Sequence, residues 1–208
     1  MRKIILTLLV LGAGLSAIAQ NTYGLDDNNA RATKKQKAMS AWQKDMAEFR
    51  ARSESDRQLN ALADSLSYIQ GRSALANQDF VLEATSVTFK NGMTAFVNST
   101  TNFISLKGNK AVVQISPSNF ASGPNGVGGV TVEGNASDIQ IRTDKKGNTT
   151  LSMNVMGIGI NAQVEVYMYP GTNRASATVY PNFNSNTVWI QGTLIPYENS
   201  DVFQGNSL

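Results

Sequence analysis

The sequence predicts a mainly β protein, an antiparallel β-sandwich or a lipocalin-like barrel of about 8–10 strands, preceded by an N-terminal amphipathic helix. Two observations predict this fold. Residues 30–72 contain no proline and a single glycine, and they are rich in good helix formers. From residue 80 onward, short β-type segments alternate with turn residues, and no helical pattern interrupts them. The absence of helical connections favours antiparallel pairing over a parallel βαβ sheet.

The first 19 residues have the layout of a secretory signal peptide. Arg2 and Lys3 precede an apolar run at residues 4–15, and Ala17 and Ala19 form a small-x-small cleavage site. We therefore expect an exported protein, periplasmic or secreted, that begins near Gln20. It contains no cysteine and so has no lipoprotein anchor, and we expect no transmembrane span after the signal.

Residues 20–73 are predicted to be helical, as one long helix or two shorter ones. Apolar side chains recur at helical spacing in a first set, Met39, Trp42, Met46 and Phe49. A second set has the same spacing on a shifted face, Leu59, Leu62, Leu66 and Ile69. Gly71 is typical of the residue that follows a helix, so we expect the helix to end there.

Residues 74–198 are predicted to form the antiparallel β domain, and residues 199–208 a C-terminal tail. The expected strands are 80–90, 94–97, 103–107, 111–116, 130–133, 137–143, 150–155, 160–169, 174–180 and 187–195. Turn residues separate them, including Gly134-Asn135 between the fifth and sixth. Within 162–169 apolar and polar residues alternate, which predicts one buried and one solvent-facing side.

Composition excludes several function classes. The chain has neither cysteine nor histidine, which rules out thiol and Ser-His-Asp catalysis and argues against the typical zinc sites, which need these residues. Without Arg2 and Lys3, 16 basic and 15 acidic residues remain, a net charge of +1 that gives no reason to expect nucleic-acid binding. We predict no catalytic residue, no cofactor and no metal.

Two further patterns favour structure over chemistry. The glycine-rich segment 123–129 lacks the Gly-Lys-Ser/Thr ending of a phosphate loop and precedes a strand, so we interpret it as a structural loop. Glu83 and Glu165 stand in mid-strand, where an inward-facing acid would be notable, but solvated strand-face charges are the commoner case. A hydrolase would need two such acids converging in a cleft.

Aromatic residues are the best candidates for contacts with a ligand or partner: Trp42, Phe49, Phe103, Tyr167, Tyr169 and Trp189. Strand aromatics either line a ligand cavity or fill a core. The helix aromatics either dock on the β domain or face a partner, a membrane or a second copy. The sequence leaves these alternatives open.

Several stretches resemble one exported Bacteroidota family: Asp79-Phe80-Val81-Leu82-Glu83-Ala84, Asn102-Phe103-Ile104, residues 123–131 and Gly192-Thr193-Leu194-Ile195-Pro196. This is the family of domain of unknown function 4251, and the resemblance covers about residues 74–198, outside the helix. It implies secretion and a β-rich domain, and no assigned activity.

We therefore expect a non-catalytic exported module that binds a small apolar or glycan-like ligand, or an envelope protein. The alternative is a structural protein that acts through protein–protein contacts of its N-terminal helix, with an oligomer as one form of this. A carboxylate-based hydrolase is a third possibility.

Overall fold

The N-terminal part of the chain is one continuous helix. The structure, a computed structural model, describes residues 25–116, 129–158, 160–182 and 186–207. Helix α1 spans Leu25–Ala76, 52 residues without a break, which corresponds to a length of about 78 Å. Of the two arrangements expected, a single long helix is the one observed.

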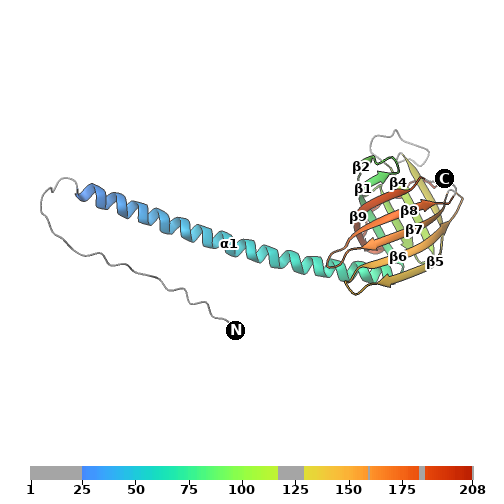
Figure 1. Cartoon of the computed structure of the whole chain (residues 1–208), viewed down its shortest axis with the longest axis horizontal. Helices are drawn as coiled ribbons and strands as arrows, with labels where there is room; N and C mark the ends of the chain where they lie inside the picture. Colours follow the sequence, from blue (N-terminus) through green and yellow to red (C-terminus); the bar gives the residue numbers. More distant parts are fainter. Residues whose placement is uncertain (1–24, 117–128, 159, 183–185, 208) are drawn as a thin grey trace. The chain divides into compact units, whose positions relative to one another are not determined.

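The remaining chain forms an antiparallel barrel (Figure 1). Its elements are β1 (Asp79–Phe89), β2 (Thr94–Phe96), β3 (Phe103–Lys107), β4 (Lys110–Ile115), β5 (Val130–Thr143), β6 (Thr149–Met156), β7 (Asn161–Met168), β8 (Arg174–Pro181), β9 (Val188–Pro196) and the 3-10 helix η1 (Tyr197–Asn199). Each strand from β3 to β9 pairs with its neighbour in sequence. Strand β1 pairs with both β3 and β9 and closes the barrel, and β2 adds to β1 as an extra strand. The expected mainly β fold is confirmed in its barrel form.

Strand β5 is longer than the sequence predicts, because it continues through a residue pair that is typical of turns. Gly134-Asn135 was expected to separate two strands, but β5 runs through both residues, so that prediction is wrong. Its register against β6 shifts between Ser137 and Gln140, which marks a β-bulge. A side chain at Gly134 would come within 2.8 Å of the Met156 carbonyl oxygen. Glycine here permits close approach of two strands and does not form a turn.

The barrel interior is filled by apolar side chains, most of them aliphatic. Along β7, Ala162, Val164, Val166 and Met168 are buried and the intervening residues are half-exposed, as the alternation predicts. The same inward set continues on every long strand and forms one cluster with the end of α1. The largest members are fully buried: Phe80, Leu82, Ile104, Leu106, Leu151, Met153, Ile190 and Leu194.

The last turns of α1 pack on the barrel. Ala74 and Leu75 are buried in the same cluster, and the hydroxyl of Tyr68 donates a hydrogen bond to the Gly147 carbonyl. Gly71 is buried within the helix, where an added Cβ would lie 3.1 Å from the Met168 sulfur and 3.2 Å from the Leu194 carbonyl oxygen. The expectation that α1 ends at Gly71 is therefore wrong, because this glycine provides close contact with the barrel.

By contacts, the chain divides into residues 1–55 and residues 56–208. The described part of the first unit belongs to α1, and it exposes Met39, Trp42 and Phe49. The second unit holds the barrel and the end of α1, on which Leu59, Leu62, Leu66 and Ile69 are exposed. No helix within the described ranges is long and apolar enough to cross a membrane.

The C-terminal residues cover part of the outer barrel surface. A second apolar cluster of Val81, Phe103 and Val112 lies outside the main core, under Tyr197 and Val202. Beside it, the side chain of the fully buried Gln114 forms hydrogen bonds both to the barrel domain and to the C-terminal tail. Its amide nitrogen donates to the carbonyls of Thr101 and Phe203, and its oxygen accepts from Thr131 Oγ1 and the Gly205 amide. The tail is thus fixed to the barrel by hydrogen bonds as well as apolar contact.

Candidate functional site

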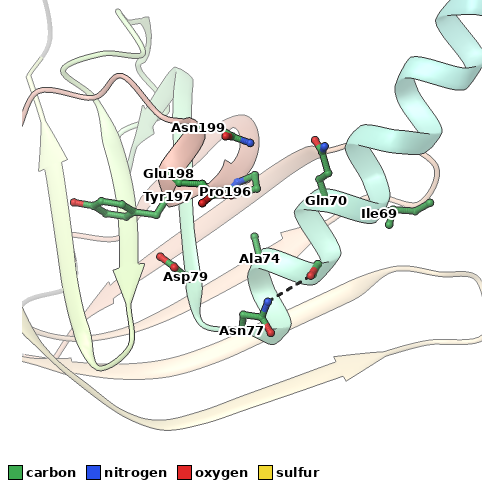
Figure 2. A pocket seen from close by; sticks show the side chains of 10 residues that line it. Ile69, Gln70, Ala74, Asn77, Asp79, Pro196, Tyr197, Glu198 and Asn199 are labelled. Carbon is green, nitrogen blue, oxygen red and sulfur yellow. Dashed lines mark hydrogen bonds between the residues drawn. The ribbon is translucent and has the colours of Figure 1, made fainter.

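A pocket of about 480 Å³ lies between the end of α1 and the segment that follows β9 (Figure 2). Both of its walls belong to the unit of residues 56–208. Its lining is mostly polar and consists of Ile69, Gln70, Ser73, Ala74, Asn77, Asp79, Pro196, Tyr197, Glu198 and Asn199. Asp79, the first residue of strand β1, and Glu198, in the 3-10 helix η1, are the two acids that line this pocket.

Asp79 is the unusual group in this pocket. Its Oδ1 atom is buried and makes no hydrogen bond within the described part of the chain. A buried polar atom without a partner costs about 1–3 kcal/mol, more for a charged group. Such exceptions are uncommon in folded proteins and call for a physical reason, one of which is a missing ligand.

The lysine that faces Asp79 on β3 contacts an aromatic ring. Lys107 lies directly opposite Asp79 in the β1–β3 pair. Its ammonium nitrogen stands 4.6 Å from the centre of the Tyr197 ring, in a cation–π contact. This contact holds Tyr197, and with it η1, against the barrel at the pocket edge.

The other polar lining groups are accessible to a ligand. Gln70, Asn77, Glu198 and Asn199 are exposed. The only hydrogen bond drawn among the lining side chains in Figure 2 runs from Asn77 Nδ2 to Ser73 Oγ, at 3.4 Å. The lining contains two carboxylates and neither lysine nor arginine. The pocket therefore offers an excess of acceptors, suited to a small molecule that supplies donors or positive charge.

The six aromatic candidates lie outside this pocket. Phe103 is buried under the C-terminal residues, whereas Trp42 and Phe49 are exposed on α1. Tyr167 and Tyr169 contact each other edge to face, with ring centres 5.0 Å apart. Trp189 is 42% exposed, and its neighbour Ile190 points into the core. None of the six belongs to the interior cluster, so the barrel interior is not a cavity lined by these residues.

The mid-strand acids also face outward. Glu83 accepts a 2.7 Å hydrogen bond from the Ser200 hydroxyl, and Glu165 accepts one of 3.1 Å from Gln163 Nε2. Among the described residues there is no group of three or more acidic, histidine or cysteine side chains arranged to hold a metal ion. The signal segment 1–19 and residues 123–128 of the glycine-rich loop lie outside the described residues.

Comparison with known proteins identifies the family. The model of the domain of unknown function DUF4251 matches residues 63–194. The chain belongs to the DUF4251 family. The DUF4251 match begins within α1, so the family domain includes the end of the helix that the sequence resemblance left out.

A solved DUF4251 structure has the same architecture. It is the crystal structure of a DUF4251 family protein from Bacteroides eggerthii, which is 46% identical in sequence, with a TM-score of 0.59. The similarity covers 69% of this chain and 96% of the other. No curated protein matches the chain. DUF4251 membership therefore establishes the fold and carries no activity with it.

Proposed function

We propose that this protein is an exported, non-catalytic binding module whose ligand occupies the pocket beside Asp79. The single observation that carries the proposal is the buried Asp79 Oδ1 without a partner, in a pocket large enough for a small molecule. A ligand donor would satisfy this oxygen and recover the free energy that its burial costs.

The ligand is a small polar molecule rich in donors, either a sugar or an amine. The acceptors Asp79 and Glu198 suit hydroxyl or ammonium groups, and the carboxamides of Gln70, Asn77 and Asn199 add donors and acceptors around them. In this proposal the ligand lies outside the barrel, and of the apolar or glycan-like ligands expected from the sequence a glycan-like one suits the polar lining. Export rests on the signal-like residues 1–19 and on the bacterial origin of the similar crystal structure.

The test is thermal unfolding of the chain from Gln20 onward, with neutral monosaccharides in one series and with ethanolamine and spermidine in the other. Binding raises the unfolding temperature in at least one series. Asp79→Asn removes the increase because it abolishes the negative charge and replaces one of the two acceptor oxygens by a donor. Asp201→Asn, a matched change at an exposed acid outside the pocket lining, retains the increase. No stabilisation in either series, or stabilisation that survives Asp79→Asn, would refute the proposal.

A carboxylate hydrolase is the second candidate, because Asp79 and Glu198 line the same pocket. A glycosidase of this kind uses one carboxyl group as acid and the other as base or nucleophile. Turnover of nitrophenyl glycosides that is lost in both Asp79→Asn and Glu198→Gln would favour it. Binding without turnover would leave the non-catalytic module as the function.

A further inference from the structure

The exposed apolar residues in the first half of α1 form a narrow stripe. Met39, Trp42, Met46 and Phe49 follow one another at intervals of three, four and three residues, the a and d positions of two heptads. Met39, Trp42 and Phe49 are 56%, 63% and 66% exposed, and Met46 is half-buried. Burial of such exposed, large apolar side chains against a partner lowers the free energy.

The width of the stripe indicates the kind of partner. At about 100° per residue, the four side chains fall within roughly 80° around the helix axis. A helix that packs on a globular core has an apolar stripe at least about 100° wide, whereas a strict a/d stripe is typical of a coiled-coil seam. The next a positions hold the small residues Ala32 and Ser53, and the next d positions hold the charged residues Lys35 and Asp56, so the apolar part of the seam is confined to residues 39–49.

One pair of opposite charges beside the stripe favours a second copy of the same chain as the partner. Asp45 stands at a g position, and Arg50 stands at the e position five residues later. In a parallel two-stranded coiled coil, g faces the following e of the other helix. Two copies in register would therefore form two Asp45–Arg50 pairs, one on each side of the seam.

The antiparallel arrangement fits less well. To keep all four apolar residues in contact, it would bring Asp45 beside Asp45 of the second copy, and like charges across the seam are destabilising. Both Asp45 and Arg50 are exposed and so available to a partner. The Asp45–Arg50 pair thus favours a parallel second copy. This attraction is confined to the centre of the stripe, because the next g and e positions hold Arg52 and Arg57, which have the same charge.

We propose that residues 32–53 of α1 pair with the same residues of a second copy, as a parallel two-stranded coiled coil. This goes beyond ligand binding and uses none of the pocket residues. The test is sedimentation analysis of the chain from Gln20 onward over a range of concentrations. The expected result is a reversible dimer that Trp42→Ala with Phe49→Ala converts to monomer. Leu62→Ala with Leu66→Ala, a matched pair on the second exposed set, leaves the dimer intact.

Charge exchange tests the direction. Asp45→Lys alone and Arg50→Glu alone each weaken the dimer, because each sets like charges opposite one another, and the double variant restores it. Since the chain has no cysteine, Ser53→Cys adds a single thiol at an a position of the seam. Two such thiols form an intermolecular disulfide by reducing oxidised glutathione, and this cross-link forms only when the two Ser53 positions adjoin.

Three outcomes would overturn the proposal. The first is a chain that stays monomeric at high micromolar concentration. The second is a dimer that the double charge variant does not restore and that Ser53→Cys does not cross-link. The third is a monomer that binds phosphatidylglycerol vesicles through Trp42 and Phe49, which would assign the stripe and the nearby cluster of Arg31, Lys34, Lys35 and Lys37 to an anionic membrane surface.

Discussion

The hydroxyl of Tyr68 donates a 2.6 Å hydrogen bond to the carbonyl oxygen of Gly147. This bond joins the last turns of α1 to the turn between β5 and β6, two segments 79 residues apart in the chain. Tyr68 also packs against the interior cluster. The end of the helix is thus a part of the barrel domain, in agreement with the family match that starts at residue 63.

Removal of this bond should weaken the helix–barrel contact. Tyr68→Phe keeps the ring and deletes the donor, and we expect it to lower the free energy of unfolding by about 1 kcal/mol. Urea unfolding followed by circular dichroism measures the change. Tyr180→Phe is the control, because Tyr180 is 40% exposed on β8. Equal stability of the two variants would contradict the structural role of the bond.

Gly192 on β9 should not tolerate a side chain. An added Cβ would clash with the Glu83 carbonyl oxygen and lie 3.0 Å from the Ala84 Cα, and these backbone atoms cannot rotate away as the end of a side chain can. We expect Gly192→Ala to cost about 1–3 kcal/mol through overpacking at the β1–β9 seam. Gln191→Ala, on the same strand and exposed, should change stability little. Denaturant titration of both variants is the measurement, and similar midpoints would count against this prediction.

Gln114 should control the attachment of the C-terminal tail. Gln114→Leu preserves bulk but leaves the Phe203 carbonyl and the Gly205 amide without their partner. We expect a loss of at least about 3 kcal/mol, because several buried polar groups are orphaned together. Hydrogen exchange should speed up at residues 203–207 and on β4. Unchanged protection of the tail amides would show that the apolar contacts suffice to hold it.

The β5–β6 turn should weaken in acid. Asn148 donates a 2.6 Å side-chain hydrogen bond to Asp144, and this bond, helped by backbone bonds from Asn148 and Lys146, holds the pKa of Asp144 below its ordinary value of 3.8. Because the pKa of Asp144 is lower in the folded than in the unfolded state, the ionised carboxylate stabilises the folded state at pH values above the unfolded pKa. This stabilisation is lost as the pH falls through the lower, folded-state pKa. The window therefore lies below pH 3.8.

Carbon-detected NMR titration of the Asp144 carboxyl group tests this assignment. Asn148→Ala should move the Asp144 pKa upward, toward 3.8, because it removes the largest cause of the shift. Lys146→Gln should raise the Asp144 pKa less, because the charge of Lys146 contributes least to the shift. A larger shift from Lys146→Gln would mean that charge, and not hydrogen bonding, sets the pKa.

Local patterns in the sequence were sufficient for the fold class. Alternation along β7 identified which residues are buried, because one face of an antiparallel strand meets the core and the other meets solvent. The two errors concern glycines. Glycine is common at helix ends and in turns, which led to the predictions at Gly71 and Gly134. In the structure each of these glycines instead allows close packing against a distant segment. Sequence spacing carries no information on such long-range contacts.

The pocket shows the same limit. Asp79 was one of several acids in the β domain, and nothing in its immediate sequence distinguishes it beyond its position directly before the buried run Phe80-Val81-Leu82. Its special character comes from Pro196, Tyr197 and Glu198, which follow more than a hundred residues later. Only the pairing of β1 with β9 brings these segments together.

That pairing also constrains the order of events during folding. Phe80 pairs with Pro196, so the barrel cannot close until the last strand, β9, pairs with the first, β1. Contacts so distant in sequence carry a large loop-closure entropy and slow the search. The backbone hydrogen bonds of helix α1 are local, but its last turns pack on the barrel and depend on the closed sheet. Until β9 is added, the edge of β1 that it covers is open to pairing with other chains.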